Sequence, residues 1–217
     1  MLLKALFVTT DHEVLPVGFV AMIIQDIDQA IQKVVFEDDE VAFEKIYKGY
    51  YTRLFRLALS VVKSEELANE VYDDVMLNVW QKRKNLAHVN NFTVYLYVSV
   101  KNASLRQLSK LGKISYIRID EDFDIQDTTP TMQEEMMSLE LLAIINQSIA
   151  ELSPKCKQVF KLVKEDGLKY KEVAEILNVS VKNVEYHMGN ALRKISENIS
   201  SNKKPLSQNA FKSIIFN

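Results

Sequence analysis

Residues 170–195 read YKEVAEILNVSVKNVEYHMGNALRKI, which is two short helical patterns with an Asn-Val-Ser break between them. In the second pattern apolar residues recur at steps of three and four, and this spacing places them on one face of a helix. These residues are Val181, Val184, Met188, Ala191 and Ile195. Ser180 stands directly before the pattern and is suited to cap its first turn. A short helix, a tight turn and a capped second helix make a helix-turn-helix, although an ordinary amphipathic hairpin has the same apolar spacing.

The polar face of this second helix carries side chains that can read DNA. In a helix-turn-helix the second helix enters the major groove, and its N-terminal residues reach base edges. We therefore expect Lys182 and Asn183 to lead, with Glu185 able to accept a hydrogen bond from cytosine. Arg193 and Lys194 are placed for phosphates. The predicted DNA-binding set is Ser180, Lys182, Asn183, Glu185, Tyr186, His187, Asn190, Arg193 and Lys194.

The residues upstream, from 26 to 109, are also helical in pattern. With only five Gly and four Pro in 217 residues, a turn-rich β fold is disfavoured. Ser64, followed by two Glu residues, predicts a helix start, because the helix dipole favours anions in the first turn. The stretch 92–108, FTVYLYVSVKNASLRQL, has the β-branched and aromatic content of a strand. Its length and apolar spacing nevertheless favour a helix buried on one face.

Between residues 112 and 130 the periodicity vanishes, which predicts a linker. A capping box at Thr131 and Glu134 starts the next helix, Ser153-Pro154 starts another, and Gly167 ends that one. The predicted fold class is all-α: two small helical domains joined by a flexible acidic linker, the second containing the helix-turn-helix. The predicted bounds are 1–25 for an N-terminal extension, 26–111 for the first domain, 112–130 for the linker, 131–199 for the second domain and 200–217 for a C-terminal tail.

Charge is segregated along the chain, although the formal net charge is only −2. Residues 81–119 contain eight Lys and Arg and no Asp or Glu, whereas acidic residues crowd the helix before them and the linker after them. Lys and Arg neutralise phosphates without reading sequence. The polar loop from Arg83 to Asn91 is a candidate for holding extruded bases, because amides can bind base edges. Runs of charge are often only solvated faces, and aromatic residues at helical spacing are more often core.

The single cysteine, Cys156, cannot form an internal disulfide, which suits a reducing compartment. We expect a small buried side chain there, and a redox sensor is the alternative. No run of eighteen apolar residues is present, so membrane insertion is not expected. The first 24 residues lack the compact apolar run and cleavage site of an export signal. The predicted location is cytoplasmic.

Motifs of catalysis are absent from the sequence. There is no Gly-rich phosphate loop, H-E-x-x-H, Cys/His cluster or G-x-S-x-G, and adjacent Asp73 and Asp74 point about 100° apart on a helix. We therefore expect no enzyme activity, no cofactor, no metal site and no small-molecule substrate. Three functions remain open as alternatives to the one inferred below. They are a stand-alone helix-turn-helix regulator that acts without a polymerase, an enzyme, and a protein-binding adaptor.

Four segments in order resemble the extracytoplasmic-function (ECF) subgroup of bacterial sigma factors, in the sigma-70 family. They are AFEKIYKGYYTRLFRLALSVV at 42–62, SEELANEVYDDVMLNVWQKR at 64–83, VYLYVSVKNASLRQLSK at 94–110 and LSPKCKQVFKLVKEDGLKYKEVAEILNVSVKNVEYHMGNALRKI at 152–195. The resemblance covers roughly residues 26–199 and is most specific in the last segment. It implies a sigma factor that binds core RNA polymerase, recognises promoter DNA, helps to melt it and so directs transcription initiation.

The resemblance also implies roles for individual residues. The helix from Ser64 would dock on the coiled coil of the polymerase β′ subunit through Asn69, Glu70, Asp73, Asp74 and Asn78. The −10 element would be melted and held by Arg83, Lys84, Asn85, Asn90, Asn91, Lys101, Asn102, Arg106 and Lys110. The second domain would grip the −35 element beside the β flap, and the acidic linker would thread toward the RNA exit path. An anti-sigma factor is a further expected partner.

Two features depart from the family pattern. Family members often carry basic residues where this chain has Glu185, His187 and Asn190, which implies a promoter preference of its own. The first twenty or so residues have no counterpart in the family, and Met22 looks more like a usual start.

Overall fold

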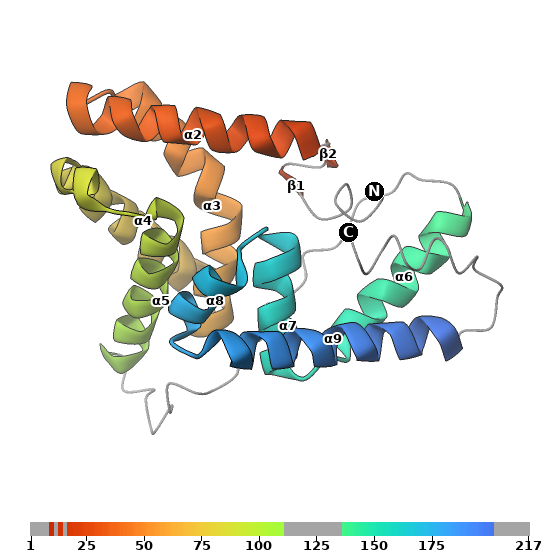
Figure 1. Cartoon of the computed structure of the whole chain (residues 1–217). Coiled ribbons are helices and arrows are strands. Elements are labelled where there is room, and N and C mark those ends of the chain that lie inside the picture. The colour runs from red at the N-terminus through yellow and green to blue at the C-terminus, as the bar shows by residue number, and fades with distance from the viewer. Residues whose placement is uncertain (1–8, 11–12, 15–16, 111–135, 202–217) are drawn as a thin grey trace. The chain divides into compact units, whose positions relative to one another are not determined.

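The computed structural model describes residues 9–10, 13–14, 17–110 and 136–201, with side chains for 27–110 and 143–201 (Figure 1). The chain divides into an upstream unit, Gly18–Gln126, and a downstream unit, Asp127–Asn217 together with Met1–Val17. The predicted linker, the capping box at Thr131 and Glu134, and the tail beyond Ser201 lie outside the described residues.

The upstream unit is built from helices. They are α2 (Val17–Glu37), α3 (Glu40–Val62), α4 (Glu65–Gln81), the 3-10 helix η1 (Arg83–His88) and α5 (Phe92–Lys110). The segment predicted as a polar loop, Arg83 to Asn91, is thus largely a 3-10 helix. Segment 92–108 forms a helix, as its length and spacing predicted.

Local polar side chains start these helices. The Asp39 carboxylate accepts a hydrogen bond from the Ala42 amide at 3.0 Å at the start of α3. Ser64 Oγ accepts from the amide of Leu67 at 3.4 Å, which confirms the predicted start of α4. These caps satisfy amides that have no partner within the first turn of the helix.

The core of the upstream unit lies where α3, α4 and α5 pack together. Tyr72 of α4 and Tyr97 of α5 are fully buried among aliphatic side chains such as Leu54, Met76 and Leu96. The Tyr72 hydroxyl donates to the backbone carbonyl of Tyr47 at 2.5 Å, so the ring is buried with its polar end satisfied. Burying each of these large side chains contributes roughly 1.5–3 kcal/mol.

The downstream unit is also helical. Its described elements are the two-residue strands β1 (Thr9–Thr10) and β2 (Glu13–Val14), which pair antiparallel, then α6 (Met136–Ala150), α7 (Pro154–Phe160), the π-helical turn η2 (Lys161–Glu165), α8 (Tyr170–Leu177) and α9 (Val181–Ser201). The sequence did not predict the small strand pair. The all-α class with a helix-turn-helix is confirmed.

The helix that begins at Pro154 differs from its prediction in two details. Ser153 stands at the N-cap position, but its side chain makes no capping hydrogen bond. The helix also widens into the π turn, where the Asp166 amide donates to the Lys161 carbonyl five residues back at 3.0 Å. Gly167 follows with a φ of 73°, in the left-handed region that glycine enters without steric cost. Its predicted role at the end of the helix is confirmed.

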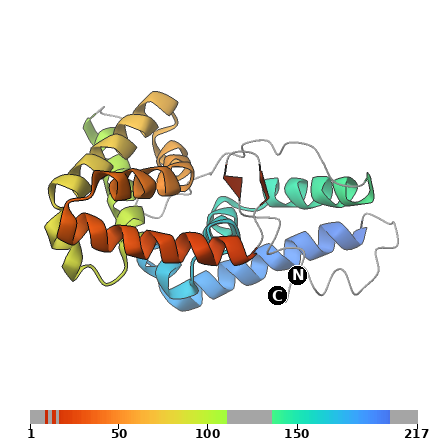
Figure 2. The same ribbon diagram turned by 90° about the horizontal axis from the view of Figure 1, so that it is seen from above.

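Helix α9 supplies much of the core of the downstream unit, because α6, α7 and α8 all pack against it (Figure 2). Val184, Met188, Ala191 and Ile195 are buried, as predicted, and Ile199 extends the stripe. Val181 is only half-buried because it stands in the first turn. In the described part of the chain, no helix is both long enough and apolar enough to cross a membrane.

Candidate nucleic-acid and polymerase interfaces

The turn between α8 and α9 has the geometry of a helix-turn-helix. Asn178 ends α8 in the left-handed conformation at φ 57°, which Asn tolerates better than most residues. The Val179 amide then donates to the Ala174 carbonyl at 2.9 Å. Ser180 Oγ accepts from the Asn183 amide at 3.2 Å, so the predicted cap of α9 is present.

The N-terminal half of α9 exposes side chains that can form hydrogen bonds. Lys182, Asn183 and Glu185 are exposed, and Tyr186 is 65% exposed. A single exposed aromatic ring is common on a folded surface, so its exposure shows only that the ring is available for contact. This face is therefore open to a partner along its first turns.

Further along α9 the predicted residues separate into two groups. Arg193 and Lys194 are exposed, and Arg193 Nη2 donates to Asn190 Oδ1 at 3.2 Å. His187 is half-buried, and its Nδ1 lies 3.7 Å from Sγ of the buried Cys156 on α7. The imidazole therefore packs toward α7, and the DNA-binding role of His187 stays a prediction.

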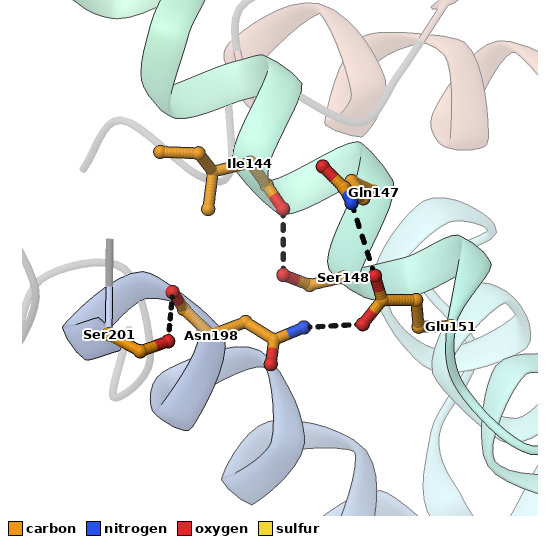
Figure 3. Close-up of a pocket in the computed structure, with 6 residues that line it drawn as sticks. All are labelled: Ile144, Gln147, Ser148, Glu151, Asn198 and Ser201. Carbon is orange, nitrogen blue, oxygen red and sulfur yellow. Dashed lines mark hydrogen bonds between the residues drawn. The ribbon is translucent and has the colours of Figure 1, made fainter.

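A small polar pocket of about 160 Å³ lies between α6 and α9 (Figure 3). Its lining residues are Ile144, Gln147, Ser148, Glu151, Asn198 and Ser201. Asn198 Nδ2 donates to Glu151 at 3.0 Å, and Gln147 Nε2 donates to the same carboxylate at 3.2 Å. The pocket contains none of the predicted site residues, and its polar groups largely satisfy one another.

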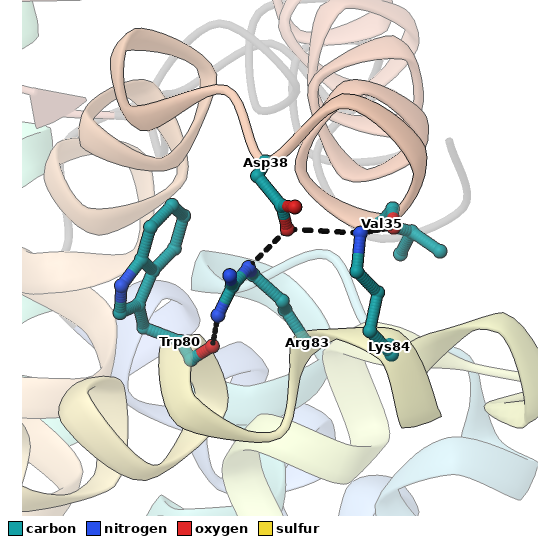
Figure 4. Close-up of polar contacts among 5 residues, drawn as sticks. All are labelled: Val35, Asp38, Trp80, Arg83 and Lys84. Atoms are coloured by element: carbon teal, nitrogen blue, oxygen red, sulfur yellow. Dashed lines mark hydrogen bonds and ion pairs between the residues drawn. The ribbon is translucent and has the colours of Figure 1, made fainter.

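In the upstream unit, two of the cations predicted to bind DNA are engaged within the protein (Figure 4). Arg83 Nε lies 2.5 Å from Asp38 Oδ1, and Lys84 Nζ lies 2.9 Å from the same oxygen. Lys84 Nζ also donates to the carbonyl of Val35 at 2.8 Å. The Arg83 guanidinium lies 4.3 Å from the centre of the Trp80 ring, a cation–π contact.

The other predicted −10 residues are mostly at the surface. Asn85 and Asn90 are exposed around η1, and Asn102, Arg106 and Lys110 are exposed on α5. Asn91 is half-buried, and its Oδ1 accepts from the Val94 amide at 3.0 Å, so it contributes to the start of α5.

Lys101 does not lie where its predicted role requires. It is only 8% exposed, and burial lowers the pKa of its amine. The cause is helical spacing, because Tyr97, Ser104 and Leu108 lie on the same face of α5 and are all buried. This burial counts against Lys101 as a phosphate-binding cation, and that role stays a prediction.

Three of the five predicted polymerase-docking residues on α4 form hydrogen bonds to neighbouring helices. Tyr51 of α3 donates to Asn69 Oδ1 at 2.8 Å, and Gln107 of α5 donates to Glu70 at 3.1 Å. Asp74 and Asn78 are exposed.

Asp73 forms a contact that sequence reasoning missed. Its carboxylate accepts from the Tyr47 hydroxyl at 2.6 Å. Burial, and then this hydrogen bond, raise the pKa of Tyr47 to about 12. The four-residue spacing of Tyr47 and Tyr51 on α3 gives no sign in the sequence that their hydroxyls bond to side chains of α4.

The residues with described side chains do not form a metal-binding site. No three His, Cys, Asp or Glu side chains there gather closely enough to hold an ion.

Comparison with known proteins identifies both units separately. The family model "Sigma-70 region 2" matches residues 46–114, and "Sigma-70, region 4" matches residues 142–195. The chain belongs to the sigma-70 family. The "ECF RNA polymerase sigma-E factor" of Haemophilus influenzae is 24% identical over 180 residues, which cover 79% of this chain and 95% of that protein. The two matched regions and this nearly full-length relative place the chain in the ECF subgroup.

Two solved structures are similar to the chain. "CnrH in complex with the cytosolic domain of CnrY" has a TM-score of 0.47 at 20% identity, covering 82% of this chain and 97% of that chain. The sigma factor RpoE from Bartonella quintana, in complex with the anti-sigma factor NepR, has a TM-score of 0.49 at 16% identity, covering 74% and 98%.

As an ECF sigma factor, the chain directs transcription initiation by RNA polymerase at promoter DNA. The family is not a family of enzymes.

Proposed function

We propose a division of labour between the two units. The downstream unit grips duplex DNA at the −35 element through the exposed start of α9, with Lys182, Asn183, Glu185 and Tyr186 at base edges. Arg193 and Lys194 hold phosphates beside them. The observation that supports this most is that these side chains are exposed on a helix whose opposite face is fixed in the core.

The upstream unit, in this proposal, docks on polymerase and holds the melted −10 strand. Helix α4 faces the β′ coiled coil with its acidic side, of which Asp74 and Asn78 are exposed. The exposed side of η1 and α5 takes the single strand, with Arg106 and Lys110 on phosphates and Asn85, Asn90 and Asn102 near the bases. Lys101 is left out of this set because it is buried.

We further propose that residues 112–130 act as the linker between the two domains, and that the protein acts in the cytoplasm, where polymerase and promoter are found. It would carry out no chemistry itself. One of the two similar structures is named as a complex with the anti-sigma factor NepR, which motivates the proposal that an anti-sigma factor also binds this chain.

Paired charge reversal tests the division of labour. Arg106→Glu with Lys110→Glu should abolish promoter opening but leave binding to core polymerase unchanged, because the proposal assigns both exposed side chains to the DNA strand and assigns polymerase docking to α4. The matched control is Lys33→Glu with Lys45→Glu, which makes the same charge change at exposed positions of the same unit. Permanganate footprinting would measure opening, and co-purification with core polymerase would measure binding. Equal loss of both activities would contradict the assignment.

Run-off transcription from a library of genomic fragments would then identify the promoters. The wild-type holoenzyme should produce transcripts from a subset of fragments that share two short elements. Transcripts that start without any shared upstream element would contradict the role of α9.

A further inference from the structure

Asp38 occupies an unusual position in the turn between α2 and α3. Its φ of 56° is in the left-handed region, which non-glycine residues rarely enter and which Asp and Asn tolerate best. The Asp38 carboxylate contacts η1, which lies 45 residues further along the chain. The Asp38 side chain is 45% exposed.

The contacts of Asp38 reproduce those of a phosphate oxygen. A single oxygen, Oδ1, accepts from Arg83 Nε at 2.5 Å and from Lys84 Nζ at 2.9 Å (Figure 4). An anionic oxygen held by one guanidinium and one ammonium is the arrangement by which proteins bind phosphodiesters. Hydrogen bonds from Lys84 and then Arg83 lower the pKa of Asp38, so the group is an anion at neutral pH.

Replacement of this carboxylate by a strand phosphate is physically easy. Lys84 and Asp38 are both well exposed, and an exposed ion pair is weak. Arg83 has two further anchors, since Nη1 donates to the Trp80 carbonyl at 2.9 Å and the guanidinium lies over the Trp80 ring. The guanidinium therefore keeps its place when its anionic partner changes.

We propose that Asp38 is an internal phosphate mimic that occupies the Arg83–Lys84 site until single-stranded DNA displaces it. The inference rests on the proposed role of η1 in holding the melted strand and adds regulation to it. Asp38 lowers the affinity of the Arg83–Lys84 pair for single-stranded DNA, because every strand phosphate that binds this pair must first compete with a tethered carboxylate. Weak, non-specific single strands are thereby disfavoured relative to strands that other contacts hold in place.

The test uses the full chain and a fluorescein-labelled (dT)20 oligonucleotide, followed by anisotropy between 20 and 150 mM NaCl. Asp38→Asn is the informative variant, since it removes the charge, keeps the size and is tolerated at this φ. It should bind the oligonucleotide about threefold to tenfold more tightly than wild type. Its log–log salt dependence should be steeper by about 0.7 for each phosphate newly neutralised.

Glu44→Gln is the matched control. It removes another exposed carboxylate of the same unit, one that pairs with Lys48 at 2.6 Å, and it should leave binding nearly unchanged. The triple variant D38N/R83Q/K84Q should lose the gain. Thermal melting followed by circular dichroism checks that each variant remains folded.

The outcomes separate the two proposals. If D38N binds no better than wild type or E44Q while R83Q/K84Q weakens binding, the mimic is wrong and the strand-binding role of η1 stands. If D38N binds more weakly, Asp38 positions the cations for DNA, which also overturns the mimic. If the triple variant binds as well as D38N, then Arg83 and Lys84 do not hold the strand and the assignment of η1 itself is wrong.

Discussion

The polar faces of α9 and of the α4–η1 segment are used in opposite ways. On α9, Lys182, Asn183, Glu185 and Tyr186 extend into solvent from a helix anchored by its apolar stripe. On α4 and η1, comparable side chains are bonded to other segments of the unit: Asn69 to Tyr51, Asp73 to Tyr47, and Arg83 to Asp38.

The two faces therefore differ in the free-energy cost of binding a ligand. A side chain that already has a protein partner must give it up before it contacts a ligand, whereas an exposed one gives up only water and rotamer freedom. The exposed face of α9 is therefore suited to discrimination between bases. The side chains of the α4–η1 face are already held in place by protein partners, so this face is suited to binding a partner without rearrangement. The following experiments test that contrast, beginning with the largest expected effect.

The two sides of α9 should respond differently to truncation. Met188→Ala should lower the free energy of unfolding of the downstream unit by about 2–5 kcal/mol, because the side chain is 1% exposed and leaves a cavity. Glu185→Ala should change it by less than about 0.5 kcal/mol. Urea denaturation followed by circular dichroism measures both. A large loss for Glu185→Ala would show that the outer face also stabilises the fold.

Within the exposed side, base contacts and phosphate contacts should separate. Asn183→Ala should reduce discrimination at one base pair of the −35 element by about 1–3 kcal/mol. Lys194→Ala should weaken all duplexes alike and reduce the salt slope by about 0.9. Binding to a randomised duplex library at two salt concentrations distinguishes them. Identical profiles for the two variants would mean that α9 is wrongly placed on the DNA.

A hydroxyl deletion compares the two faces directly. Tyr51→Phe should destabilise the upstream unit by about 0.5–1.5 kcal/mol, because the half-buried hydroxyl donates to Asn69 at 2.8 Å. Tyr186→Phe, the same change at a 65% exposed position, should have an effect near zero on stability. Chemical denaturation of both variants provides the measurement, and equal effects would remove the contrast between the faces.

The Tyr47–Asp73 bond should be visible in an alkaline titration. Because its pKa is raised from 10.0 to about 12, Tyr47 stabilises the native state fully below pH 10 and loses that contribution as the pH rises toward 12. At pH 10.5, wild type and Tyr47→Phe should therefore have nearly equal tyrosinate absorbance at 295 nm. An unshifted phenol would give wild type an excess of about three quarters of one tyrosinate, and that excess would contradict the raised pKa of Tyr47.

Local features were predictable from sequence because they depend on neighbouring residues. Ser64 and Ser180 cap the helices that they were expected to cap, and Gly167 ends its turn in the left-handed region. The burial of one face of α9 followed from the apolar spacing. The helix at 92–108 followed from length and spacing against its β-like composition, because tertiary packing outweighs intrinsic propensity.

Contacts between distant segments were not predictable in this way. Nothing in the local sequence pairs Asp38 with Arg83 or directs His187 toward Cys156, since those contacts depend on how helices pack. The burial of Lys101 was not predictable for the same reason. A lysine in a basic segment looks solvent-facing, yet its four-methylene stem can be buried along an apolar face.

The long stripe of α9 has a consequence for how this protein can diverge. Helix α9 packs against three other helices, and inward positions such as Val184 and Met188 are fully buried, so few replacements there are compatible with folding. The outward positions carry almost none of that constraint. Promoter preference can therefore change one side chain at a time while the fold stays the same. Duplicated copies of such a gene could acquire separate target genes through folded intermediates alone.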